Sequence, residues 1–192
     1  IEEQSISGVI SQQMQRDAVL AVLISGVLML VYIWIRFKDL KFGASAVFAL
    51  LHDVLVVIAV YAMTRISVGN TFIACLLTIV GYSINATIVI FDRVRENRKL
   101  MSKSDLDVIV NTSITQTLSR SINTSLTTFV TIFVLYIVGV ASIREFALPL
   151  MAGIISGCYS SVCIAGAMWY IMKKHSDKKH ADDGTDKIKG KK

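Results

Sequence analysis

The side chains best suited to chemistry in this sequence are a few polar and ionisable groups inside apolar segments. Asp53, with His52 beside it, lies at the centre of an apolar run from residue 43 to residue 64. An acid in such a run is costly to bury. It either handles ions or hydrogen-bonds a neighbouring helix as a packing contact. The residues alone leave both interpretations of Asp53 open.

A second polar set lies within the stretch TIVGYSINATIVIF. Thr78, Tyr82 and Asn85 have i, i+4, i+7 spacing, which places them on one face of a helix. Ser83 and Thr87 form a second pair four residues apart. Hydroxyls commonly bond the backbone of their own helix, and we expect this of Ser83 and Thr87. The amide of Asn85 has four hydrogen-bonding sites, so we expect it to face other helices.

A third set begins at Arg120 and continues through Thr124, Thr127 and Thr131, at spacings of four, three and four. A guanidinium therefore heads a stripe of hydroxyls on one helix face. Arg120 is either an anchor at the cytoplasmic membrane surface or an electrostatic partner for groups deeper in the bundle. Small residues recur every four positions at Gly153, Gly157 and Ser161. This ridge predicts a close helix contact.

The elements that position these residues are predicted to be transmembrane helices. The hydrophobic fraction is 54%, the mean hydropathy is +0.61 and the net charge is +6, which excludes an ordinary soluble domain. Five runs are long enough to cross the bilayer, at 17–36, 43–64, 70–91, 120–140 and 146–172. The sequence therefore predicts an all-α, polytopic bundle of five transmembrane helices.

Basic residues orient this bundle. All but three of the 20 Lys and Arg residues fall on one face of the five-span arrangement, and the exceptions are Arg16, Arg65 and Arg144. Positive charge marks the cytoplasmic side, so we expect the N-terminus outside and the C-terminus in the cytoplasm. No nucleophile–base pair, phosphate-binding glycine loop or metal cluster stands out. We therefore expect no enzymatic activity, cofactor, metal or nucleic-acid partner.

The polar ends and connections complete the predicted organisation. We expect residues 1–16 to lead into the first helix, residues 17–172 to form the bundle, and residues 173–192 to be a disordered basic tail near membrane lipids. The cytoplasmic connection 92–122 carries an amphipathic stripe, with Ser104 as its N-cap. Its charged start is either a solvated helix end or a docking surface for a partner. The residues concerned are Asp92, Arg93, Arg95, Glu96 and Asn97.

Four motifs, LLHDVLVV, TFIACLLTIVGYSIN, FDRVREN and TQTLSRSINTSLTT, resemble the SecF family of protein-export membrane proteins, or the SecF half of a fused SecDF. This family belongs to the RND superfamily of transporters. The resemblance implies a place in the bacterial cytoplasmic membrane, with SecD, the SecYEG channel and the translocating polypeptide as partners. It also implies use of an ion gradient. A SecF unit has six spans with an extracytoplasmic domain after the first, so we expect that span and domain to lie upstream, with residues 1–16 at the end of the domain.

One position departs from the family pattern. The resemblance implies an acidic residue after GYSIN as a site of proton or sodium transfer, and Ala86 stands there. Ion coupling at this point is lost, or Asp53 and Asn85 perform it differently, or the alanine was introduced deliberately. Arg120 matches the family's intramembrane arginine. Asp53 is then the only intramembrane acid able to balance it.

Two hypotheses of different class follow from the resemblance. The chain is half of an ion-coupled secretion motor, with Asp53, Asn85 and Arg120 lining the ion path. Alternatively, it is a passive scaffold that holds SecD and the channel together, with its coupling site inactive at Ala86. An RND-type exporter of small molecules is disfavoured, because the motifs match SecF itself.

Overall fold

Long helices make up almost all of the chain that the computed structural model describes, residues 2–66 and 68–176. In chain order they are α1 (Glu2–Phe37), α2 (Leu40–Thr64), α3 (Asn70–Leu100), α4 (Leu106–Val138) and α5 (Ala141–Tyr159). A π-helical segment, η1 (Ser160–Ala165), follows α5 directly, and regular helix then continues to residue 176. Residues 2–66 and 68–176 contain no strand. The predicted all-helical fold is confirmed.

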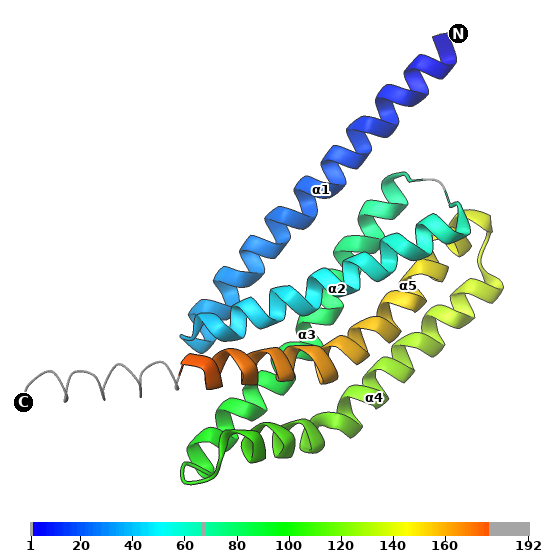
Figure 1. Cartoon of the computed structure of the whole chain (residues 1–192). Coiled ribbons are helices and arrows are strands. Elements are labelled where there is room, and N and C mark those ends of the chain that lie inside the picture. The colour runs from blue at the N-terminus through cyan, green and yellow to red at the C-terminus, as the bar shows by residue number, and fades with distance from the viewer. Residues whose placement is uncertain (1, 67, 177–192) are drawn as a thin grey trace, which may run out of the picture.

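Each helix contains a segment long and apolar enough to cross a bilayer. The five segments are Val19–Phe37, Leu40–Thr64, Thr71–Leu100, Leu106–Val138 and Ala141–Ser176. Hydrocarbon offers no water to backbone groups, so such segments satisfy their backbone hydrogen bonds internally as helices. Consecutive helices run in opposite directions. The α1–α2 turn, the α3–α4 turn and the far end of the last helix therefore gather at one end of the bundle (Figure 1).

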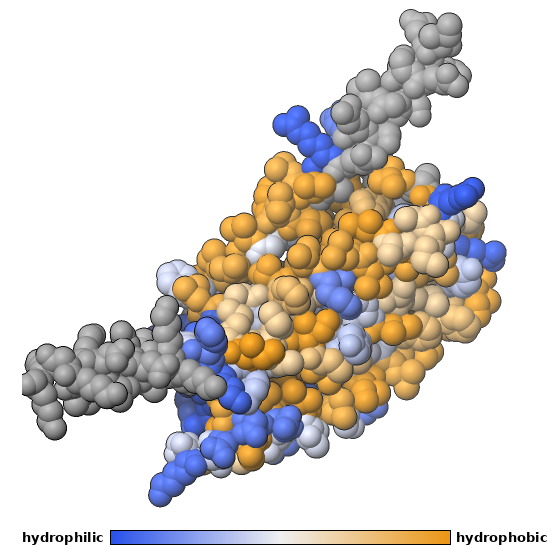
Figure 2. Space-filling view, in the orientation of Figure 1, coloured by the Kyte–Doolittle hydropathy of each residue, from blue (hydrophilic) through white to orange (hydrophobic). Residues whose placement is uncertain are grey.

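An apolar surface surrounds the bundle. Figure 2 shows hydrophobic side chains over the middle of the visible face and hydrophilic ones gathered near the end that holds the α3–α4 turn. Large apolar side chains such as Val27 on α1 and Val134 on α4 are more than half exposed. A surface of this kind matches the hydrocarbon layer, as the five-helix membrane prediction requires.

The α3–α4 turn differs from the prediction of an amphipathic helix within residues 92–122 that has Ser104 as its N-cap. α3 continues through the charged sequence DRVRENRKL to Leu100, and α4 begins at Leu106 with Asp105 as its N-cap residue, one position after the expected Ser104. The segment 92–122 is thus divided between the end of α3 and the start of α4. The sequence DRVRENRKL contains no Gly or Pro to end the helix, so α3 extends past the membrane.

α2, α3 and α5 form the centre of the bundle, with α1 and α4 on the outside (Figure 1). Within an apolar 18-residue window of each span, 39%, 44% and 50% of the residues are buried in α2, α3 and α5, against only 6% in α1 and 11% in α4. The outer faces of α1 and α4 are therefore available to lipid or to another protein.

The glycines of the predicted ridge lie where α5 approaches α2 and α3. A Cβ atom at Gly153 would lie 2.0 Å from Cδ1 of Ile79 and 3.1 Å from Cγ2 of Val57. A Cβ atom at Gly157 would lie 3.4 Å from Cβ of Ser83. The absence of side chains at these two positions lets α5 come close enough for its hydroxyl groups to reach α2 and α3.

Candidate functional site

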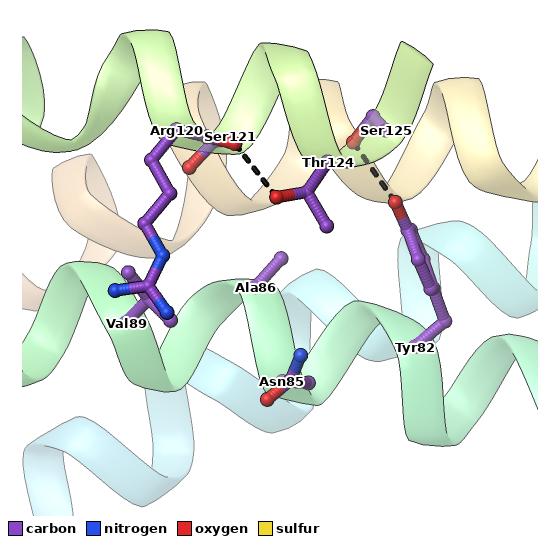
Figure 3. A pocket seen from close by; sticks show the side chains of 8 residues that line it. All are labelled: Tyr82, Asn85, Ala86, Val89, Arg120, Ser121, Thr124 and Ser125. Atoms are coloured by element: carbon purple, nitrogen blue, oxygen red, sulfur yellow. Dashed lines mark hydrogen bonds between the residues drawn. The ribbon is translucent and has the colours of Figure 1, made fainter. Parts of the chain in front are cut away.

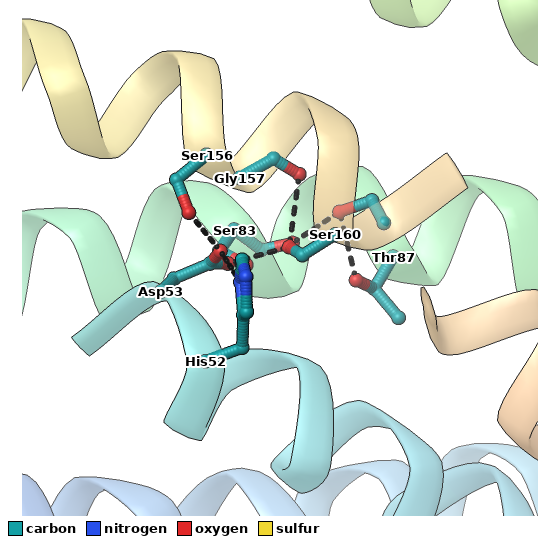
Figure 4. A network of polar contacts seen from close by, with 8 residues as sticks. His52, Asp53, Ser83, Thr87, Ser156, Gly157 and Ser160 are labelled. Atoms are coloured by element: carbon teal, nitrogen blue, oxygen red, sulfur yellow. Dashed lines mark hydrogen bonds and ion pairs between the residues drawn. The ribbon is translucent and has the colours of Figure 1, made fainter. Parts of the chain in front are cut away.

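Asp53 on α2 lies fully buried at the centre of the bundle. Ser83 on α3 donates a hydrogen bond to Oδ2 of Asp53 at 2.5 Å, and Ser160 in η1 donates to the same oxygen at 2.7 Å. Ser156 on α5 donates to Oδ1 at 2.7 Å, and Nδ1 of His52 lies 3.2 Å from that oxygen (Figure 4). We call Asp53 and these three serines the Asp53 cage. It joins α2, α3, α5 and η1 through a single carboxylate.

The Asp53 cage lies near the middle of the bilayer. Asp53 is 13 residues after the start of α2 and 11 residues before its end, or about 20 Å and 16 Å at about 1.5 Å per residue. The hydrocarbon layer is about 30 Å thick, so the carboxylate lies close to its centre. A buried carboxylate is tolerated only when hydrogen-bond donors replace water. The three serine hydroxyls provide those donors.

A run of hydroxyls continues from the cage toward the end that holds the α1–α2 turn. Ser161 Oγ donates to the backbone carbonyl of Ser83 at 3.3 Å and lies 3.0 Å from Oγ1 of Thr87. The prediction that Ser83 and Thr87 bond the backbone of their own helix is therefore wrong. The close approach of α5 at Gly157 brings hydroxyl partners within reach of α3.

Apolar side chains close this polar run in both directions. Toward the α1–α2 turn, the rings of Phe42 and Trp169 stack with centroids 4.6 Å apart, and Phe91 lies 4.8 Å from Phe42. Toward the opposite end, Val57 and Ile79 are fully buried beside the ridge. Along the bundle axis, the cage is therefore sealed on both sides by the described side chains.

His52 connects the cage with the bundle surface. Its side chain is 36% exposed, whereas that of Asp53 is 1% exposed. The His52 ring lies with its centroid 6.1 Å from that of Tyr159, which is itself exposed. Imidazole nitrogens both accept and donate protons. His52 is thus the residue beside Asp53 that could pass a proton sideways to the outer surface of α2.

A second polar site lies on the opposite side of α3. A cavity of about 60 Å³ between α3 and α4 is lined by Tyr82, Asn85, Ala86, Val89, Arg120, Ser121, Thr124 and Ser125. Figure 3 shows the Arg120 side chain extending from α4 toward Val89 and the Ala86 methyl group pointing toward α4. Tyr82 closes the other end of the cavity, where its hydroxyl donates to Ser125 at 3.1 Å. We call this space the Arg120 cavity.

A wider groove continues from the Arg120 cavity toward the α3–α4 turn. Its volume is about 520 Å³, and it shares Asn85, Val89 and Arg120 with the cavity. Asp92, Arg93, Glu96, Gln116 and Thr117 line its remainder, together with Ile88. Arg120 lies 18 residues before the end of α4, or about 27 Å, so it sits near one boundary of a layer about 30 Å thick. The groove therefore links the Arg120 cavity with the water at that boundary.

The polar set expected to line one path is divided by α3. Ser83 and Asn85 are two positions apart, or about 200° around a helix axis, so α3 presents Ser83 to the Asp53 cage and Asn85 to the Arg120 cavity. Asp53 and Arg120 form no ion pair. The expected balance of Arg120 by Asp53 is therefore absent, because the acceptor atoms of Asp53 are already engaged by serines.

The hydroxyl stripe that begins at Arg120 lies on the exposed face of α4. Thr124, Thr127 and Thr131 each donate to a backbone carbonyl of α4 three or four residues earlier, at 2.8 to 2.9 Å. Their hydrogen-bonding capacity is thus largely satisfied within the helix. The hydroxyl hydrogens of these three threonines are therefore engaged and not free to bind a ligand.

One face of the charged sequence at the end of α3 contacts α1. Asp92 pairs with Arg36 at 3.0 Å, and Arg95 donates to the backbone carbonyl of Arg36 at 3.1 Å. Both members of the ion pair are more than 40% exposed, so this contact adds little to stability. These two contacts join α1 to the end of α3.

Another face of the same charged sequence, which carries Arg93 and Asn97, contacts α4. Arg93 contacts Glu96 at 2.6 Å and donates to Gln116 at 2.6 Å. Asn97 donates to Ser113 at 2.8 Å and to Gln116 at 2.9 Å, and it is only 3% exposed. Both alternatives given for this segment, a solvated helix end and a docking surface, place Asn97 at the surface, but its side chain is an internal joint between α3 and α4. Polar residues in the first turns of α4, Ser113 and Gln116, cover the side chain of Asn97.

Two members of the cage, Ser156 and Ser160, were missed in the sequence. They lie four residues apart beside the glycine ridge, and this spacing was the available signal. The spacing of the ridge predicts packing alone, yet Ser161, its third member, also bonds Thr87.

Comparison with known proteins places this arrangement in a family. Residues 1–175 match the family described as protein export membrane protein SecD/SecF, C-terminal. The chain is 45% identical over 182 residues to the protein translocase subunit SecF of Alicyclobacillus acidocaldarius, covering 93% of this chain and 59% of that protein. It is 42% identical to the protein translocase subunit SecDF of Bacillus subtilis, covering 91% of this chain and 24% of that protein.

A solved structure leads to the same family. The crystal structure of SecDF in a super-membrane-facing form matches with a TM-score of 0.81 and 42% identity, over 88% of this chain and 23% of that one. The chain spans less than two thirds of the length of each of these relatives. The match extends over nearly the whole helical bundle, and so the chain belongs to the SecD/SecF C-terminal family of protein-export membrane proteins.

Proposed function

We propose that this chain is the membrane part of an accessory subunit that helps the SecYEG channel export polypeptides, and that an ion gradient acts on it through Asp53. The observation that carries the proposal is the Asp53 cage. One carboxylate at the middle of the bundle accepts hydrogen bonds from α3, α5 and η1. A change in its charge therefore acts on the contacts of three neighbouring segments at once.

Protonation of Asp53 would change the hydrogen bonds that join these segments. An ionised carboxylate only accepts hydrogen bonds, whereas a protonated one also donates. Its two oxygens have four partner atoms, from Ser83, Ser156, Ser160 and His52. A proton on Oδ2 needs an acceptor there, so the hydroxyl of Ser83 or Ser160 must turn away or reverse its bond, whereas Nδ1 of His52 can accept a proton placed on Oδ1. Repeated binding and release of the proton would thus move α5 relative to α2 and α3.

The outer face of α3 and α4 fits a companion subunit better than lipid. Asn85, Arg120, Asn123 and Thr124 are exposed there, within or at the edge of the predicted hydrocarbon layer. Exposed polar groups at that depth normally face protein or a water-filled path. SecD, or the SecD half of the same protein, is the proposed companion. The proposed orientation in the bacterial cytoplasmic membrane has the N-terminus outside and the C-terminus in the cytoplasm, following the basic residues.

A passive scaffold is the second candidate, and Ala86 favours it. The side chain of Ala86 cannot bind a proton, and it lies in the Arg120 cavity, where the guanidinium has no acid beside it. In this alternative, the chain joins SecD to the channel, and the Asp53 cage only holds the helices together.

Secretion measured with and without a proton gradient separates the two candidates. The variants are Asp53→Asn, which keeps the size of the side chain and cannot titrate, and Ala86→Asp, which adds an acid. Coupling through Asp53 predicts gradient-dependent secretion in the parent protein, and loss of that dependence in Asp53→Asn while co-purification with SecD and SecYEG persists. Gradient dependence that appears only in Ala86→Asp would refute coupling in this chain. Failure to co-purify with either partner would end the scaffold candidate.

A further inference from the structure

Arg120 carries a positive charge without a counter-charge in the described part of the chain. No hydrogen bond or ion pair of its guanidinium group occurs within residues 2–66 and 68–176, although its backbone carbonyl accepts from Thr124. The guanidinium lies at the junction of the Arg120 cavity and the wider groove. A charge near the edge of the hydrocarbon layer is unfavourable unless water or a group of opposite sign compensates for it.

The acids nearest to this junction are already engaged. Asp92 pairs with Arg36 at 3.0 Å, and Glu96 contacts Arg93 at 2.6 Å. Both of these acids line the groove, and neither lines the cavity. Arg120 therefore supplies the net positive charge of the cavity lining, since the other seven residues are neutral.

The lining also supplies neutral donors. The amide of Asn85 and the hydroxyl of Ser121 border the same space as the guanidinium. The hydroxyl hydrogen of Tyr82 is already donated to Ser125 and is not available to a ligand. The volume of about 60 Å³ exceeds the roughly 10–15 Å³ that a single water needs. The space is therefore large enough for a small ion and a water, and the groove gives access from the aqueous boundary.

From the unpaired guanidinium, the neutral donors, the volume and the access route together, we infer that the Arg120 cavity binds a small monovalent anion of the chloride type. The anion enters along the groove from the α3–α4 turn and rests beside Arg120, in the space left free by the short side chain of Ala86. This inference does not depend on coupling through Asp53, because the two sites lie on opposite sides of α3.

The test uses the full-length protein, purified both alone and with its companion subunit. Melting temperature is recorded against increasing sodium chloride or bromide, with sodium gluconate at equal ionic strength as the reference. Line broadening of ³⁵Cl NMR measures binding directly. We expect a halide-specific rise in melting temperature, since a ligand that binds the folded state stabilises it by mass action. Arg120→Gln should abolish both signals. Arg65→Gln, at the exposed C-terminal end of α2, is the matched control and should preserve both.

Two substitutions at Ala86 test the position of the anion. Ala86→Asp supplies a fixed carboxylate next to Arg120, so the melting temperature should rise without halide and the halide effect should disappear. Ala86→Asn fills similar volume without charge, so the halide effect should disappear without that rise. Undiminished halide broadening in Arg120→Gln would overturn the inference. A halide effect found only in the separated chain would also overturn it, because a carboxylate of the companion would then hold the place.

Discussion

Replacing Ser156 with alanine tests whether the Asp53 carboxylate is held as a charged group. The substitution removes one of three serine donors and leaves Oδ1 of Asp53 with His52 at 3.2 Å. Ser156 is 8% exposed, so water cannot readily take the place of its hydroxyl. Hydrogen bonds to charged groups contribute about 1.5–3 kcal/mol, whereas interhelical hydrogen bonds in membranes average about 0.6 kcal/mol. We expect Ser156→Ala to lower the free energy of unfolding by at least about 1.5 kcal/mol.

The matched control is Ser45→Ala on α2. Ser45 is as buried as Asp53, but its hydroxyl donates only to backbone carbonyls of its own helix, at 2.7 Å and 3.1 Å. A hydroxyl bonded in this way adds little to helix stability, so the control should change the free energy of unfolding only slightly. The assay is reversible unfolding in mixed micelles, in which the fraction of denaturing detergent is raised and helicity is followed.

A double-mutant cycle with Asp53→Asn identifies the cause of the loss. If the hydroxyl of Ser156 stabilises a charge, Ser156→Ala should cost much less in the Asp53→Asn background, because the charge is gone. Equal losses in both backgrounds, or a loss no larger than that of Ser45→Ala, would refute the assignment of Ser156 as a donor to an ionised Asp53.

Three further predictions concern packing and orientation. Gly153→Ala should destabilise the bundle by about 1–3 kcal/mol, since its Cβ atom would overlap the side chain of Ile79, whereas Gly81→Ala, with no atom within 4 Å, should be neutral or stabilising by up to about 1 kcal/mol. Asn97→Ala should cost about 1–3 kcal/mol through loss of the α3–α4 joint, as judged by unfolding against the exposed Asn111→Ala. In a cysteine-free background, Ser102→Cys should react with an impermeant maleimide only after the cells are opened, and Val140→Cys should react in intact cells. The reverse pattern would contradict the proposed orientation.

The fold could be predicted because membrane helices are specified by length and hydropathy, and these are local properties of the chain. The five apolar runs correspond to the five spans. The extensions of the helices beyond these runs could not be predicted in the same way, since a hydropathy window stops where charges begin, whereas α3 continues through Arg93 to Leu100. The midpoint position of Asp53 was also predictable, because it depends only on counting residues along α2.

The contacts of each polar residue could not be predicted, because they depend on how far each helix is rotated about its axis. Spacing placed Tyr82 and Asn85 on one face of α3, and both line the Arg120 cavity. The opposite face, which carries Ser83, meets Asp53 because of the way in which α2 and α5 pack. The partners Ser156 and Ser160 depend on the depth at which α5 sits, and this depth is set by Gly153 and Ile79 together.

The π-helical turns of η1 offer a place where the two ends of the last helix can rotate relative to each other. If one of their i→i+5 hydrogen bonds is exchanged for an i→i+4 bond, the π-helical segment moves by one residue along the helix. Each step would rotate the part of the helix that carries Trp169 relative to the part that carries Ser156. A change in the hydrogen bond of the Ser160 hydroxyl would thus turn the buried indole of Trp169, at the end of the bundle that holds the α3–α4 turn.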